Sequence, residues 1–198
     1  MNLLTDKKII LASSSPRRLD LLRQVGVEPE VFPVEVAERH DLEGLSADTL
    51  VIYNATLKAQ AAHDAWRKKG GAPGLILGAD TVVVQNDVLF GKPRDAAEAV
   101  AMLATLSGSI HSVFTGQCLI DSATGATVAA ARETRVTFAD MSEEAILAYV
   151  ASGEPLDKAG AYGMQGLGGL FVKSISGDYS TVVGLSLPLL YQMVRQLA

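Results

Sequence analysis

Cysteine, histidine and basic side chains are scarce in this sequence, and each scarcity excludes a class of protein. Cys118 is the single cysteine among 198 residues, so an intramolecular disulfide and a multi-cysteine metal site are excluded. The three histidines, His40, His63 and His111, have no ligand-like spacing, and we expect them to be structural. Only 17 Lys and Arg stand against 22 Asp and Glu, and the net charge of −5 argues against broad binding to nucleic acid or to an anionic membrane.

Long apolar runs are absent as well. The first residues, Met1 to Lys8, lead into an apolar run that is too short for a signal peptide or a membrane span. With 48% hydrophobic and 20% charged residues, the chain can bury one sizeable core, which predicts a single domain over residues 1–198. A cytoplasmic enzyme is the resulting expectation. The oligomeric state is left open, with a homodimer as one option.

Strands and helices alternate through the first half of the sequence, and a hairpin follows. We expect strands over 8–13, 31–36, 75–84, 109–120, 127–138 and 170–175, and helices over 16–25, 46–69, 95–106, 142–152 and 180–197, the last interrupted near Pro188. This order predicts an α/β fold with a mixed sheet flanked by helices. In such sheets the ligand cleft lies at strand ends.

A hydroxyl-rich turn, Ser13–Arg18, joins the first strand to the first helix. We expect Ser15 to be the N-cap, with its hydroxyl accepting a backbone N–H, and Pro16 to be the first helical residue. Arg17 and Arg18 then fall in the first turn, where the helix dipole disfavours a cation by roughly 0.3–1 kcal/mol. A phosphate bound by these arginines and the preceding serines would explain the pattern. Two solvated arginines are the alternative.

Two carboxylates and two lysines are further candidates. Asp80 interrupts the apolar third strand, so we expect it to bind a metal, to pair with a cation, to sit at a strand break opened by Gly78, or to cap a turn. Glu38 follows the end of the second expected strand. Lys58 has small neighbours on its helix and either reaches into a cleft or lies along the surface. Lys92 stands between a glycine and a proline on a constrained loop.

These side chains together predict a metal-dependent phosphoryl hydrolase. Two carboxylates from different loops would hold Mg²⁺ or Mn²⁺, and phosphate oxygens and waters would complete the octahedron. The cations would neutralise a polyphosphate and its leaving group, while one carboxylate would orient or deprotonate the attacking water. The glycine-rich segment 155–169 is either a flexible loop or a stretch where the backbone approaches the ligand closely.

Four stretches, Ser13–Arg18, Gly78–Thr81, Gly91–Pro93 and Lys158–Gly166, resemble the signatures of the Maf nucleoside triphosphate pyrophosphatases. The resemblance implies a fold related to the inosine triphosphate pyrophosphatases, a divalent metal, and hydrolysis of a nucleoside triphosphate to the monophosphate and pyrophosphate. It makes Asp80 the general base. The residues that it implies are Asp80, Glu38, Lys58 and Lys92 for catalysis, Glu38 and Asp80 for the metal, and Ser13, Ser14, Arg17, Arg18, Thr81 and Gln165 for the substrate.

Three of these positions, Arg17, Thr81 and Gln165, differ between subgroups of that family, and here they resemble the dTTP/UTP pyrophosphatases. The 7-methyl-GTP subgroup tends to have a tryptophan, a glutamine and a glutamate instead. The amide of Gln165 can both donate to and accept from the O4 and N3–H edge of uracil or thymine. Modified uridine triphosphates are then further substrates, and the protein would clean the nucleotide pool. Two alternatives are a nucleotide-binding regulator of septum formation and a pyrophosphatase that acts on inosine triphosphate.

Overall fold

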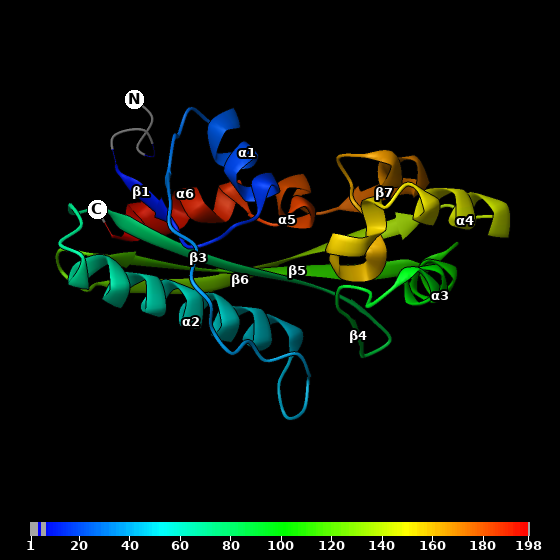
Figure 1. The fold of residues 1–198 in the computed structure, drawn as a ribbon, viewed down its shortest axis with the longest axis horizontal. Helices are drawn as coiled ribbons and strands as arrows, with labels where there is room; N and C mark the ends of the chain where they lie inside the picture. Colours follow the sequence, from blue (N-terminus) through cyan, green and yellow to red (C-terminus); the bar gives the residue numbers. More distant parts are fainter. Residues whose placement is uncertain (1–3, 5–6, 198) are drawn as a thin grey trace. The chain divides into compact units, whose positions relative to one another are not determined.

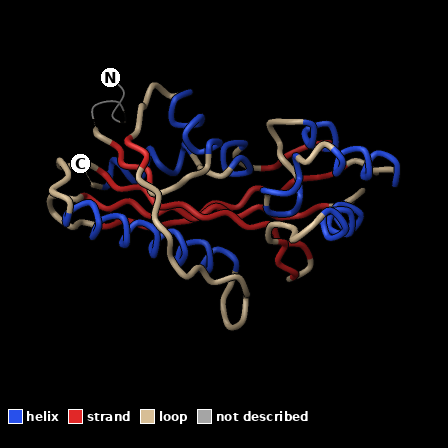
Figure 2. The backbone as a smooth tube through the Cα atoms, in the orientation of Figure 1, coloured by secondary structure: helices blue, strands red, loops and turns tan. Residues whose placement is uncertain are grey.

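The computed structural model describes residue 4 and residues 7–197, so the leading segment 1–8, in which we expect no signal peptide, lies partly outside it. The described strands form a seven-stranded sheet in the order β2-β1-β3-β5-β6-β7, with β4 paired to β3 (Figures 1 and 2). The pairs β1–β2 and β1–β3 are parallel, whereas β3–β4 and β6–β7 are antiparallel. The mixed sheet with flanking helices is therefore confirmed.

The strands are β1 (Ile9–Leu11), β2 (Glu30–Val31), β3 (Leu75–Gln85), β4 (Val88–Phe90), β5 (Ile110–Asp121), β6 (Thr127–Phe138) and β7 (Val172–Ser176). The α-helices are α1 (Pro16–Gln24), α2 (Ala47–Lys68), α3 (Ala96–Leu106), α4 (Glu143–Ala151), α5 (Tyr179–Val183) and α6 (Leu187–Gln196). Three short 3₁₀ helices are η1 (Glu154–Asp157), η2 (Ala159–Ala161) and η3 (Leu167–Phe171). Within the described part of the chain, no helix is long and apolar enough to cross a membrane.

The chain divides into two compact units, and both are built from separate segments. The first unit contains 1–80, 115–132 and 184–198, and the second contains 81–114 and 133–183. Three of the four boundaries fall within β3, β5 and β6, so each of these strands contributes one part to each unit, and the fourth falls between α5 and α6. The single-domain organisation expected from the sequence stays a prediction.

In the first unit, α2 covers one face of the strands, and α1 and α6 cover the other (Figure 1). Alanines of α2 pack with Trp66 against buried strand residues such as Ile76 and Cys118. Gly78 is required for this close packing, because a Cβ there would lie 2.2 Å from the carbonyl oxygen of Ala55. The glycine in β3 therefore brings α2 against the strand and does not break it.

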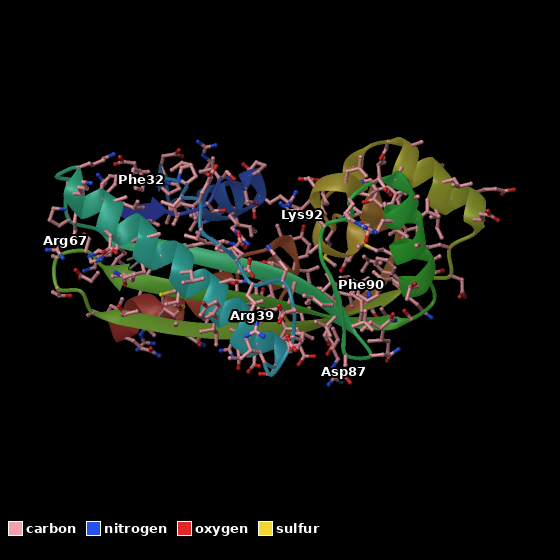
Figure 3. All side chains as sticks on the ribbon, turned by 60° about the horizontal axis from the view of Figure 1, so that its bottom comes forward. Phe32, Arg39, Arg67, Asp87, Phe90 and Lys92 are labelled. Carbon is pink, nitrogen blue, oxygen red and sulfur yellow. The ribbon has the colours of Figure 1, made fainter. Side chains whose placement is uncertain are left out.

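In the second unit, a core of aliphatic and aromatic side chains lies between α3, α4 and the strands. The hairpin between β3 and β4 turns at Asn86 and Asp87, whose φ angles of 49° and 61° are left-handed. Figure 3 shows Asp87 at the tip of this hairpin, and Phe90 on the returning strand is buried in the core. The sequence Gln85–Val88 is typical of a hairpin loop, and the antiparallel pairing of β3 with β4 confirms that prediction.

One expectation about local structure is wrong. The second strand is only Glu30–Val31, and residues 32–46 contain neither helix nor strand. Pro33 lacks the N–H that a longer strand would need, and β2 lies at the edge of the sheet. Glu38 therefore lies well beyond the strand end, on an irregular segment. Of the two alternatives for the glycine-rich segment 155–169, the flexible loop does not hold, because most of η1, all of η2 and the start of η3 lie within it.

Candidate active site

Lys58 joins the two candidate carboxylates of the first unit. Its Nζ lies 2.6 Å from Oε2 of Glu38 and 2.9 Å from Oδ1 of Asp80. The side chains of Lys58 and Asp80 are only 12% and 11% exposed. Asp80 is thus paired with a cation, which is one of the alternatives that its position in an apolar strand left open. Lys58 reaches inward from α2 and does not lie along the surface.

The charge of Asp80 is held by three neighbours. Burial raises the pKa of Asp80, but the Lys58 ammonium, the Asn54 amide and the Arg18 guanidinium together outweigh burial and lower the pKa below its ordinary value. Asn54 Nδ2 donates to Asp80 Oδ2 over 3.0 Å. Asp80 is therefore ionised at neutral pH and remains able to accept further hydrogen bonds through its free lone pairs.

Asn54 is a site residue whose role the sequence did not reveal. Its Oδ1 accepts the backbone N–H of Arg39 at 2.9 Å, and its Nδ2 donates to the Arg39 carbonyl at 2.9 Å as well as to Asp80. Figure 3 shows Arg39 on the loop beside the N-terminal half of α2. One buried amide thus fixes the irregular segment that carries Glu38. An asparagine on the buried face of α2, one turn before Lys58, was the available signal.

The turn before α1 is held by Ser13 and Arg18. Ser13 Oγ accepts from the Ser15 backbone N–H at 3.2 Å and from Arg18 Nη1 at 3.0 Å, and Arg18 Nε donates to the Gly184 carbonyl at 2.8 Å. Burial lowers the pKa of Arg18, whereas the carboxylates of Asp80 and Glu38 raise it. Arg18 is therefore fixed near these carboxylates, and the solvated alternative does not hold for it.

The first helix starts at Pro16 as predicted, but its cap differs from the prediction. Ser15 occupies the N-cap position with an extended backbone, yet its side chain makes no capping hydrogen bond. The hydroxyl of Ser13 binds the Ser15 N–H instead. Ser14 is exposed and Arg17 is half-buried, and their predicted role in substrate binding stays a prediction.

The second unit contains the remaining candidates. Thr81 is half-buried on β3 directly after Asp80, while Lys92 and Gln165 are exposed. Lys92 and Gln165 stand in two sequence motifs that contact each other within this unit. The contact is a hydrogen bond from the Gly160 N–H to the Gly91 carbonyl at 3.1 Å. Ala161 has a φ of +58°, a strained conformation for a residue with a side chain. The roles of Thr81, Lys92 and Gln165 in substrate binding stay predictions.

A divalent metal would find a small set of oxygen ligands in the first unit. Among residue 4 and residues 7–197, no three His, Cys, Asp or Glu side chains come together as a metal-binding group. Glu38 and Asp80 are two carboxylates brought together by one lysine. Mg²⁺ is commonly bound by one or two carboxylates together with substrate phosphates, whereas a structural cage needs more protein ligands. The donor set therefore fits a metal that arrives with a phosphorylated substrate.

Comparison of the whole sequence with known proteins identifies its family. Residues 8–197 match the family described as Maf-like protein. This chain belongs to the Maf family. A dTTP/UTP pyrophosphatase of Gloeobacter violaceus is 47% identical over 189 residues, which cover 96% of this chain and 95% of that protein. A dTTP/UTP pyrophosphatase of Bacillus cereus is 45% identical over 190 residues, or 96% of this chain and 90% of that protein.

The fold has a counterpart among solved structures. The superposition on the Ham1 protein of Staphylococcus aureus covers 97% of this chain and 100% of that chain, with a TM-score of 0.51 and 15% sequence identity. At this identity the likeness concerns the fold alone. The expected α/β fold with a mixed sheet flanked by helices is confirmed, and the chain shares this fold with the Ham1 protein.

Proposed function

We propose that this chain hydrolyses dTTP and UTP, and modified forms of UTP, to the monophosphate and pyrophosphate. The observation that carries the proposal is the bridge from Glu38 through Lys58 to Asp80, with Arg18 and Ser13 nearby. Carboxylates and cations in this order suit a polyphosphate with a bound metal. The relatives named dTTP/UTP pyrophosphatase, 45–47% identical along almost the whole chain, support the choice of substrate.

The residues of the first unit would act on the phosphates as follows. Lys58 and Arg18 attract the polyphosphate and neutralise charge that develops on the leaving pyrophosphate. Asp80, ionised and buried, accepts a proton from the attacking water. Asn54 and Lys58 hold the Asp80 carboxylate in one orientation, so no rearrangement of this group is needed during the reaction.

A divalent cation, Mg²⁺ or Mn²⁺, is part of the proposal. Glu38 and Asp80 would hold it, and when bound it would supply positive charge at the phosphate oxygens. Before it binds, Lys58 neutralises the repulsion between the two carboxylates and keeps them within reach of each other. Lys58 therefore keeps the two metal ligands close together and also provides a positive charge for the phosphates.

Selectivity for the base is a further part of the proposal. We propose that the exposed amide of Gln165 reads the O4 and N3–H edge of uracil or thymine. Arg17, Thr81 and Lys92 are proposed contacts of the substrate, on the strength of the family motifs in which they stand. The expected consequence in the cell is removal of unwanted nucleotides from the pool.

Pyrophosphate release by the purified protein tests this function. The panel contains dTTP, UTP, CTP, GTP, ITP and 7-methyl-GTP, each assayed with Mg²⁺, with Mn²⁺ and with EDTA. We expect dTTP and UTP to be turned over best and EDTA to abolish turnover. Preference for ITP or 7-methyl-GTP would contradict the assignment of the base, and full activity in EDTA would contradict the metal.

The link to septum formation is a separate part of the proposal. If hydrolysis underlies it, overproduced Asp80→Asn protein will not affect division, whereas the wild-type protein will. An unchanged effect on division with abolished hydrolysis would favour a regulator that only binds nucleotide. Measuring both properties for the same variant distinguishes these outcomes.

A further inference from the structure

One carboxylate in the second unit, that of Glu154, binds the backbone directly after Gln165. Glu154 Oε2 accepts the Leu167 N–H at 2.9 Å, and Oε1 accepts the Gly168 N–H at 3.1 Å. Oε1 also accepts the hydroxyl of Tyr149 at 2.8 Å. A single side chain on η1 therefore fixes the backbone that follows Gln165.

The backbone before Gln165 is fixed through the same pair of side chains. The Gly163 N–H donates to the Tyr149 hydroxyl at 3.1 Å, and that hydroxyl donates to Glu154. Burial raises the pKa of Tyr149, so the hydroxyl keeps the proton that it donates. Gln165 thus stands on a short turn whose two ends meet at one phenol and one carboxylate.

The glycines of this turn are required by that arrangement. A Cβ at Gly166 would lie 2.3 Å from Glu154 Oε2, and a Cβ at Gly168 would lie 2.5 Å from the Tyr149 hydroxyl and 2.7 Å from the Gly163 carbonyl oxygen. The glycines therefore leave room for Glu154 and Tyr149, and the turn is a packed structure around them.

Glu154 is ionised in this setting. Burial raises its pKa, but the N–H donors of Leu167 and Gly168, the Tyr149 hydroxyl and the Lys158 ammonium lower it below the ordinary value overall. A charged acceptor makes stronger hydrogen bonds to backbone N–H groups than a neutral one does. The three hydrogen bonds of the carboxylate group are therefore stronger than those that an amide would make.

We propose that Glu154 is a positioning residue that sets base selectivity through Gln165. This inference rests on the proposed function. A glutamine amide that can shift, or rotate so that its oxygen and nitrogen exchange places, pairs with cytosine as well as with uracil. The reason is that cytosine presents a donor where uracil presents an acceptor, and an acceptor where uracil presents a donor. Selectivity for dTTP and UTP over CTP needs the amide to be held in one place, and Glu154 and Tyr149 hold the backbone from which it projects.

The experiment compares kcat/KM for dTTP with kcat/KM for CTP in the wild type and in Glu154→Gln. The substitution keeps the size of the side chain but turns one acceptor into a donor that faces a backbone N–H. We expect the ratio of dTTP to CTP to fall about tenfold, as expected for loss of a fixed hydrogen-bonding group in a selective site. Tyr149→Phe, which removes only the hydroxyl, is the milder second variant and changes the ratio in the same direction.

Two further variants separate positioning from general damage. Glu144→Gln removes the same charge from an exposed position on α4, and it keeps the wild-type ratio. In a Gln165→Ala background the ratio is already low, so Glu154→Gln lowers it no further if it acts through Gln165. Circular dichroism and thermal unfolding of every variant show whether it is folded.

The outcomes distinguish this inference from the proposed function. If the wild type itself does not prefer dTTP over CTP, the proposed function is wrong. If the wild type does and folded Tyr149→Phe and Glu154→Gln keep its ratio, or lower kcat/KM for both nucleotides equally, the positioning role is overturned. If Glu154→Gln and Gln165→Ala each lower the ratio, and the double variant lowers it by the product of the two factors, the residues act independently. That result would overturn the positioning role as well.

Discussion

A buried histidine in the second unit makes the stability of this protein depend on pH. His111 is 2% exposed, and its Nε2 lies 2.9 Å from the Tyr162 hydroxyl. Its ring packs edge-on against Phe138 and Tyr162, with ring centroids 4.9 and 5.3 Å away. Burial among these aromatic rings lowers the pKa of His111 to about 4 from its ordinary 6.5.

The sign of the effect follows from proton binding. Between pH 6.5 and about 4, the unfolded chain protonates His111 and the folded chain does not, so the unfolded state binds more protons. The contribution is fully present above pH 6.5 and is lost as the pH falls toward 4. A difference of about 2.5 pH units, at about 1.36 kcal/mol for each unit, corresponds to about 3 kcal/mol of unfolding free energy.

The test compares wild type with His111→Gln, whose amide is not titratable and still offers Tyr162 a hydrogen-bond partner. Urea unfolding followed by far-ultraviolet circular dichroism at steps of pH gives both curves. The carboxylates are common to both proteins, so the difference between the curves reports His111. We expect wild type to lose about 3 kcal/mol more than the variant between pH 6.5 and 4.

Removing an exposed histidine provides the control. His40→Gln changes the same residue type at an exposed position of the first unit, so its curve shows the effect of replacing a histidine that is not buried. Parallel curves for wild type and His111→Gln would refute the reasoning, because they would mean that burial does not hold His111 neutral.

Two further substitutions test how the first unit is built. Asn54→Ala removes three hydrogen bonds, to Arg39 and Asp80, and should lower the free energy of unfolding by about 2–4 kcal/mol, whereas Gln60→Ala on the exposed face of α2 should cost less than about 0.5 kcal/mol. Equal urea midpoints for these two variants would contradict the conclusion that Asn54 fixes the segment that contains Arg39. Gly78→Ala would push a methyl group into α2 and should cost about 3 kcal/mol, whereas Gly91→Ala meets nothing within 4 Å and should leave the thermal midpoint unchanged. A wild-type midpoint for Gly78→Ala would mean that α2 can move away.

Much of the fold was predictable because its signals are local. Caps, glycine stops and the apolar period mark α2 and α3, and turn residues mark the hairpins. The pairing of Asp80 with a cation was among the predicted alternatives, because a carboxylate in an apolar strand needs a partner. The choice of Lys58 as that partner depends on the approach of α2 to β3, which only the folded chain shows.

Other features were not predictable because their causes are distant in sequence. Residues 31–36 alternate in a way that is typical of a strand, so the end of β2 at Val31 could not be inferred, and the hydrogen bonds between Asn54 and Arg39 join residues distant in sequence. Glu154 is one carboxylate among many until the turn at 163–168 folds onto it. The Ser15 side chain makes no capping hydrogen bond, and the Ser13 hydroxyl instead accepts from the Ser15 N–H and from Arg18, a contact that depends on the folded turn.

The most direct measurement concerns Asp80, on which the proposed chemistry depends. Asp80→Asn keeps the shape of the side chain and removes its charge. With Mg²⁺ or Mn²⁺ supplied, we expect kcat for pyrophosphate release from dTTP to fall at least about 100-fold while the protein stays folded. Asp64→Asn, at an exposed position of α2, should retain wild-type kcat. A folded Asp80→Asn protein with more than about a tenth of wild-type kcat would contradict the account, since the reaction would then not need this carboxylate.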